Sequence, residues 1–134
     1  MKNLAFTKDQ LISCLSFDEN DYNKAIEGSD ENATFDEFIQ NIMDSCKECN
    51  GTLLDAIFLA DNSFEGLGKK VYDVQFDDDD STNCKGFRET YGYCKNYIED
   101  NNGTNWSYFE DYKGGTVSII NNETGETAYW EEVK

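Results

Sequence analysis

The chain contains no His and no Pro, and only eleven of its 134 residues are Lys or Arg. The absence of His excludes Ser-His and Cys-His catalysis, Cys₂His₂ zinc sites and pH switches that depend on imidazole. No segment approaches the roughly 20 consecutive apolar residues that a transmembrane helix needs. Any catalysis would have to use carboxylates, Cys, Tyr, Lys or the single Arg, which is Arg88.

Acidic residues, in contrast, are abundant: 28 Asp and Glu give a formal net charge of −17. They are spread along the chain, since residues 1–60 hold 12 acids and 4 bases and residues 61–134 hold 16 acids and 7 bases. Nine Phe, eight Tyr and two Trp indicate an ordered core. We therefore expect a folded body with an anionic surface, which repels nucleic acids and anionic membranes and attracts basic protein surfaces.

Residues 1–65 predict a helical region of three to four short helices. Sequences of capping-box form begin at Thr7, Ser16 and Thr34. The third gives the strongest signal, because apolar residues from Phe35 to Cys49 recur at helical spacing. The apolar run 53–60 fits either a helix or a buried strand, and we favour a helix.

Residues 66–134 predict a β-α-β-β region with an antiparallel sheet. Residues 70–76, 108–112, 115–121 and 126–133 have strand-like patterns, and the last two segments are joined by a hairpin turn that ends at Gly125. A helix is predicted from Phe87 to about residue 100, because four apolar residues recur there at helical spacing: Phe87, Tyr91, Cys94 and Ile98.

We therefore predict an α+β fold, in which an N-terminal helical layer (residues 1–65) packs with the C-terminal sheet region (residues 66–134). The two regions share a core and form one compact domain. The run of four Asp at 77–80 is expected to be a solvated loop, because four adjacent carboxylates cannot be buried.

The cysteines allow two interpretations. Cys46 and Cys49 have C-x-x-C spacing, and with Cys84 and Cys94 they could form a structural zinc site. The alternative is that these are ordinary cysteines, because Cys46 and Cys94 fall on apolar stripes and buried Cys behaves as a small hydrophobe. We favour the second interpretation, because the second pair is separated by ten residues rather than two to four, and we predict no metal.

Catalytic and ion-binding motifs are weak elsewhere in the chain. Residues 61–66 resemble the start of an EF-hand loop, but Tyr72 stands where the bidentate carboxylate is needed. No Gly-rich segment has the spacing of a phosphate-binding loop, and the acids are too numerous for a catalytic pair to be chosen. We therefore expect a protein that is not an enzyme and has no cofactor.

The acids of the second half are the candidate partner-binding residues, with exposed aromatic side chains as anchors at the interface. The candidate acids are Asp73, Asp77, Asp78, Asp79, Asp80, Glu110, Asp111, Glu131 and Glu132, and the candidate anchors are Trp106, Tyr108 and Trp130.

The pervasive acids, the four-Asp loop and the segment 111–126, with its Gly-containing turns, resemble small inhibitors that phages and mobile elements use against host defence. The resemblance is to anti-CRISPR proteins and antirestriction DNA mimics as a class. It implies stoichiometric binding to the basic nucleic-acid-binding site of a CRISPR effector nuclease or restriction enzyme, which would block DNA binding by charge mimicry.

Two alternatives remain open: an immunity protein that neutralises a basic toxin, and a Cys-rich structural zinc module. The expected partner is a basic protein surface, without direct binding to nucleic acid or membrane. We expect a cytoplasmic protein, located in the host cell if it is phage-encoded, because Lys8 and Asp9 interrupt the N-terminal segment and leave no signal-peptide core.

Overall fold

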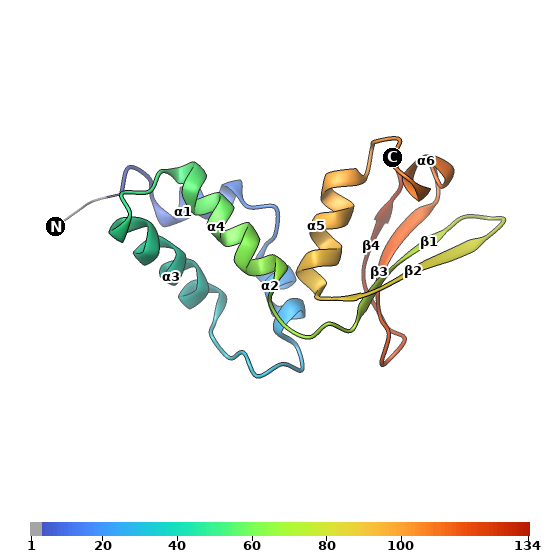
Figure 1. The fold of residues 1–134 in the computed structure, drawn as a ribbon, viewed down its shortest axis with the longest axis horizontal. Coiled ribbons are helices and arrows are strands. Elements are labelled where there is room, and N and C mark those ends of the chain that lie inside the picture. Colours follow the sequence, from blue (N-terminus) through green and yellow to red (C-terminus); the bar gives the residue numbers. More distant parts are fainter. Residues whose placement is uncertain (1–3) are drawn as a thin grey trace.

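Helices form the first half of the chain and a sheet forms most of the second half (Figure 1). The computed structural model describes residues 4–134. The predicted α+β class is confirmed. The helices are α1 (Lys8–Cys14), α2 (Glu19–Ile26), α3 (Phe35–Glu48), α4 (Leu53–Glu65), α5 (Tyr91–Asn101) and α6 (Tyr108–Asp111). The strands are β1 (Tyr72–Asp77), β2 (Thr82–Glu89), β3 (Thr116–Asn121) and β4 (Thr127–Glu132).

Side-chain caps begin the first four helices. Thr7, Thr34 and Thr52 each accept a hydrogen bond from the backbone N–H three residues later, and the side chain at that later position accepts one in return. Helix α2 begins after Asp18 and not after Ser16, because the Asp18 carboxylate accepts from the backbone N–H of Asp21 at 2.9 Å. Residues 53–60 are helical, as favoured above, and α4 continues to Glu65.

The four strands form one antiparallel sheet in the order β2-β1-β3-β4. The four-Asp run forms the end of β1 and the turn into β2. The predicted turn between the last two strands joins β3 to β4, and Gly125 adopts a φ of 78° there, which a residue without a Cβ tolerates.

Strand β2 was not predicted, and the expected helix starts later than proposed. Phe87 belongs to β2, and α5 begins after Thr90, whose hydroxyl accepts from the backbone N–H of Tyr93 at 3.2 Å. The region is therefore β-β-α-α-β-β and not β-α-β-β. As an edge strand, β2 buries little, and Phe87 is its one large apolar residue.

The predicted strand at 108–112 is instead the short helix α6. The aromatic side chains of α6 and of Tyr112, which caps its C-terminus, all pack around Phe76 of β1: the ring centroids of Tyr108, Phe109 and Tyr112 lie 5.6, 4.9 and 5.7 Å from that of Phe76. A strand would have directed alternate residues to opposite sides, whereas one helical turn places all three on the same side.

Helix α5 lies between the N-terminal helices and the sheet (Figure 1). A series of packed aromatic rings runs from the N-terminal helices through α5 to the sheet. Phe17 stacks on Phe64 of α4 at 4.0 Å, Phe64 meets Tyr91 of α5 at 6.3 Å, and Tyr91 meets Tyr72 of β1 at 5.6 Å. The apolar core is therefore continuous from the helical layer to the sheet.

A buried polar network accompanies the rings. Lys95 of α5 and Asp21 of α2 are each 7% exposed, and their charged atoms lie 3.4 Å apart. Tyr91 donates its hydroxyl to Asp21 at 2.9 Å, and the Lys95 ammonium lies 4.0 Å above the ring of Tyr129 in β4. Burial, and then the charge of Asp21, raise the pKa of Tyr91, so its hydroxyl stays protonated and donates.

Helices α4 and α5 approach each other closely at Gly92. A Cβ at this position would lie 2.1 Å from the carbonyl oxygen of Phe64, which belongs to the backbone of α4 and cannot turn aside.

Among residues 4–134, no helix combines the length and apolar character that a bilayer crossing requires.

We predict that Gly92→Ala lowers the free energy of unfolding by about 1–3 kcal/mol, because the added methyl group forces α4 and α5 apart. Gly86→Ala in β2 is the control, since a Cβ there meets nothing within 4 Å; we expect it to change stability by less than about 0.5 kcal/mol. Urea denaturation followed by circular dichroism measures both. Equal stability of the two variants would contradict the close packing at Gly92.

Candidate functional site

One end of the sheet gathers most of the predicted partner-binding acids. Strand β1 ends at Asp77, which pairs with Thr116 at the start of β3, and Thr116 pairs with Glu132 at the end of β4. Asp77 and Glu132 therefore lie in one cross-strand row, on the same face of the sheet and two strand spacings, or about 9.5 Å, apart.

Helix α6 brings two more acids to this end. Tyr112 directly follows α6, and its hydroxyl lies 2.7 Å from that of Ser81 and accepts a hydrogen bond from the side-chain amide of Asn83 in β2. These contacts hold α6, with its exposed Glu110 and Asp111, beside the β1–β2 hairpin. We call the resulting group the acidic end; it consists of Asp77, Asp78, Asp79, Asp80, Glu110, Asp111 and Glu132.

The hairpin turn leaves two of these carboxylates without an internal role. Asp78 accepts from the backbone N–H groups of Asp80 and Ser81, both at 2.8 Å, and Asp77 accepts from the hydroxyl of Thr82 at 2.6 Å. Within residues 4–134, the side chains of Asp79 and Asp80 accept no hydrogen bond and are exposed. The β1–β2 hairpin projects from the body of the molecule, so its tip is accessible (Figure 1).

Three bases lie near the acidic end and partly offset its charge. Lys85 is directed over the ring of Tyr108, with its ammonium 5.0 Å from the centroid. Lys113 donates to the side chain of Asn105 at 2.9 Å, and Lys134 ends the chain beside β4. Seven carboxylates against three ammonium groups leave the acidic end strongly negative.

Two predicted binding acids have structural roles instead. Asp73 is 9% exposed and accepts from the backbone N–H of Arg88 at 2.9 Å, where the β1–β2 register shifts and Arg88 adopts a φ of 51°. Glu131 is half-buried and accepts from the amide of Asn102 at 2.6 Å and from the hydroxyl of Tyr129 at 2.5 Å. Burial, and then this bond to Glu131, raise the pKa of Tyr129. Neither acid is free to pair with a partner.

The predicted aromatic anchors differ in accessibility. Trp130 is 63% exposed and lies on the sheet face opposite α5, in one cross-strand row with Ser118, Gln75 and Cys84. Trp106 is 61% exposed in the loop between α5 and α6. Tyr108 packs against Phe76 and is half-buried. Trp130 and Trp106 can therefore contact a partner, and Tyr108 contributes mainly to the core.

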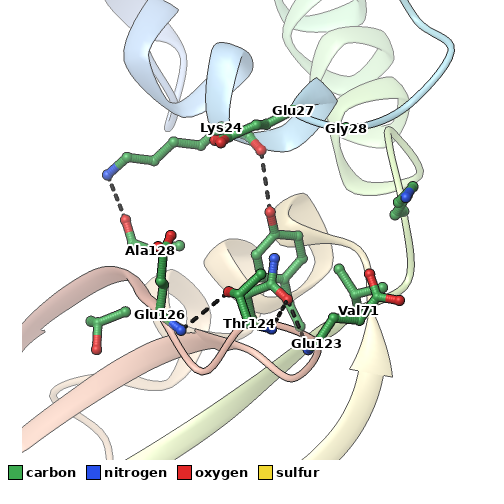
Figure 2. Close-up of a pocket in the computed structure, with 12 residues that line it drawn as sticks. Lys24, Glu27, Gly28, Val71, Glu123, Thr124, Glu126 and Ala128 are labelled. Atoms are coloured by element: carbon green, nitrogen blue, oxygen red, sulfur yellow. Dashed lines mark hydrogen bonds between the residues drawn. The ribbon is translucent and has the colours of Figure 1, made fainter.

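A cleft of about 410 Å³ separates α2 from the β3–β4 hairpin (Figure 2). It contains Lys24 and Lys69 together with three acids, Glu27, Glu123 and Glu126. The Lys24 ammonium is already held by the carbonyl oxygen of Ala128. The cleft mixes both signs of charge and one of its two cations is engaged, so it does not define a class of ligand.

An exposed apolar patch on α4 was not predicted. Leu54 and Phe58 are 61% and 60% exposed, and Leu59 is 36% exposed. The available signal was the run 53–60, which contains more large apolar residues than the buried side of one helix can hold.

The structure does not bring the four cysteines of the zinc hypothesis together. Cys46 and Cys49 lie at the end of α3, Cys84 is on β2 and Cys94 is on α5. Cys46 and Cys94 are buried among apolar residues, as favoured above, whereas Cys49 and Cys84 are exposed. In the described part of the chain, no three His, Cys, Asp or Glu side chains are arranged to hold a metal ion. Likewise, 61–65 belong to α4 and form no EF-hand loop.

Comparison with known proteins identifies no relative. No protein-family model matches the chain, and neither a curated protein nor a solved structure matches it significantly. A function must therefore be argued from the surfaces described above.

We predict that three thiols per chain react rapidly with a disulfide reagent at pH 8 and that all five react after unfolding in guanidinium chloride. Cys14, Cys49 and Cys84 are exposed. Cys46 and Cys94 are buried, which keeps the reagent from their sulfur atoms, and burial also raises the pKa of Cys94 to about 12. Partial burial, and then the charge of Asp73, raise the pKa of Cys84, so we expect it to be the slowest of the three accessible thiols. Absorbance of the released thiol gives the count. Rapid reaction of all five thiols would contradict the buried positions of Cys46 and Cys94.

Proposed function

We propose that this chain is an acidic protein inhibitor that binds the basic nucleic-acid-binding site of a host defence nuclease, of the CRISPR-effector or restriction type, and blocks DNA binding by charge mimicry. One observation carries the proposal: the acidic end places seven carboxylates together, two of them free at the tip of a projecting hairpin, on a body of net charge −17. The phage and mobile-element origin follows from the class-level resemblance described above.

The electrostatic argument starts from the site that such an inhibitor would occupy. Duplex DNA carries one negative charge per about 1.7 Å of its axis, so a groove that binds it is lined with closely spaced Lys and Arg. The acidic end offers carboxylates within a few residues of one another on the hairpin and about 9.5 Å apart across the sheet. Long-range attraction between the two surfaces would speed association, and salt would weaken it.

The exposed tryptophans would add affinity that charge alone does not supply. Trp130 lies two residues from Glu132 and on the same sheet face, so that one partner could contact both. Trp side chains are frequent among the few residues that dominate binding energy at interfaces. We assign Trp130 the role of the main apolar anchor, with Trp106 as a second one.

The remaining parts of the proposal concern the setting in which the protein acts. It works by stoichiometric binding and not by catalysis, requires no cofactor, and contacts neither nucleic acid nor membrane directly. Its site of action is the cytoplasm of the host cell, where the nucleases of restriction and CRISPR systems meet DNA.

The first test identifies the partner. The chain is immobilised, and host lysate is applied at about 50 mM and about 200 mM salt. We expect a DNA-binding nuclease to be retained at the lower salt concentration and to be displaced by free duplex DNA. The purified nuclease should then lose its gel shift with labelled DNA when the chain is added. A partner that binds no nucleic acid would contradict the proposal, and a secreted toxin would favour the immunity alternative.

We predict that the double variant Asp79→Asn/Asp80→Asn binds the nuclease about tenfold more weakly and with a shallower salt dependence, because it loses the two carboxylates of the hairpin tip that have no internal hydrogen bond. The matched control is Asp9→Asn/Asp30→Asn, which removes the same net charge from exposed positions in the helical half. Fluorescence anisotropy with labelled nuclease measures both variants. Equal weakening by the two would show that total charge matters and the acidic end does not.

A further inference from the structure

Helix α4 is apolar on two opposite sides, although only one of them is buried. Its inner side carries Ala56, Ala60 and Phe64, each fully buried against the core. Its outer side carries Leu54 and Phe58, which are one helical turn apart and therefore adjacent. With the neighbouring Leu59 they form what we call the α4 patch. A surface helix normally has a polar outer side, so large apolar side chains that are exposed together there mark a contact surface.

The surroundings of the patch are acidic. Helix α4 contains Asp55, Asp61 and Glu65 and no base. Each of these carboxylates already accepts one hydrogen bond within the molecule, from the backbone N–H of Thr52, the hydroxyl of Ser16 and the side-chain amide of Asn96 respectively, so they act on an occupant through their negative charge. Helices α1, α3 and α5 pack against it, and they carry one Lys each. Lys8 is paired with Asp36 at 3.0 Å and Lys95 is buried, which leaves Lys47 as the free cation of these four helices. An occupant of the patch must therefore combine apolar side chains with positive charge.

The acidic surroundings of the α4 patch argue against a second copy of this chain, and against an anionic membrane surface, as its occupant. A second copy would pack patch against patch about a twofold axis, which sets acid against acid and one charge of −17 against another. An anionic membrane surface would be repelled for the same reason. Charge complementarity selects a protein segment with Lys or Arg beside its apolar residues.

We infer that the α4 patch is a docking surface for a basic amphipathic helix of another protein, whose apolar side packs on Leu54, Phe58 and Leu59 while its Lys and Arg meet the surrounding acids. Helix-on-helix docking of this kind relies on apolar anchors spaced by one turn. The surface belongs to the helical layer and shares no residue with the acidic end. The inference therefore goes beyond the proposed function and does not depend on a nuclease partner.

The test uses two fluorescein-labelled synthetic peptides of equal length and charge. One is an amphipathic helix of Leu and Lys, and the other has Ser in place of each Leu. Binding is measured by fluorescence anisotropy. We expect the wild-type chain to bind the Leu/Lys peptide at least about tenfold more tightly than the Ser/Lys peptide, since the two differ in the apolar side that the patch would contact.

Phe58→Ser should abolish this preference, and Leu54→Ser should reduce it. Both side chains are about 60% exposed, so the variants should retain the wild-type unfolding midpoint. Asn62→Ser is the control, because Asn62 is exposed one turn beyond Phe58 and is not apolar. The Asp79→Asn/Asp80→Asn variant should weaken both peptides alike and leave the preference intact, which separates this inference from the proposed function.

Three results in solution, and one with lipid vesicles, would overturn the inference. The first is an equal affinity of the wild-type chain for the two peptides, and the second is an unchanged preference in Phe58→Ser. The third is a stable dimer in sedimentation equilibrium that Phe58→Ser dissociates, since a second copy would then cover the patch. Flotation of the wild-type chain with phosphatidylcholine vesicles is the remaining control, and binding lost in Phe58→Ser would assign the patch to a membrane surface instead.

Discussion

The structure depends on the burial of α5 between the helical layer and the sheet, which otherwise meet through few contacts, such as the bonds from Lys24 to Ala128 and from Tyr72 to Lys24. Tyr91 and Lys95 reach from this helix to Asp21 in α2, and Lys95 also covers the ring of Tyr129 in β4. A buried charge is costly unless it is paired and hydrogen-bonded, so each member of this network requires the others. The aromatic chain through Phe64 and Tyr91 adds apolar burial along the same path. Because the two layers share these contacts, the helical half and the sheet half form one core.

This core stabilises the fold enough to allow a surface with a very large net negative charge. A net charge of −17 repels itself in the folded state, and the continuous aromatic core offsets that repulsion. The folded chain then presents two surfaces of different character. The acidic end is charged and projects on a hairpin, whereas the α4 patch is apolar with acids around it. The first suits long-range attraction of a basic groove, and the second suits short-range packing with an apolar segment.

Local chemistry explains which elements could be predicted. Helices α1 to α5 begin where a Thr or Asp side chain can accept from the third backbone N–H, and α3 was placed from Thr34 and its apolar stripe. Strand β2 and helix α6 were missed because neither is stabilised locally. β2 is a polar edge strand held by its pairing with β1, and α6 is a single turn held by Phe76, which lies more than thirty residues earlier. Of the candidate site, the four-Asp turn and both tryptophans were recognised, whereas the internal roles of Asp73 and Glu131 were not.

The sequence by itself determined the sign and size of the charge, the absence of His chemistry, the α+β class and the starts of α1 and α3, because these follow from composition and from contacts within a few residues. The tertiary structure decided which acids are free. Asp73 and Glu131 look like the other carboxylates along the chain, and they are used internally because strand pairing and the α5 C-terminus bring Arg88 and Asn102 to them. It also decided that Leu54 and Phe58 stay outside the core. Burial is a property of how helices pack on one another, and the apolar run alone does not specify which side of α4 faces inward.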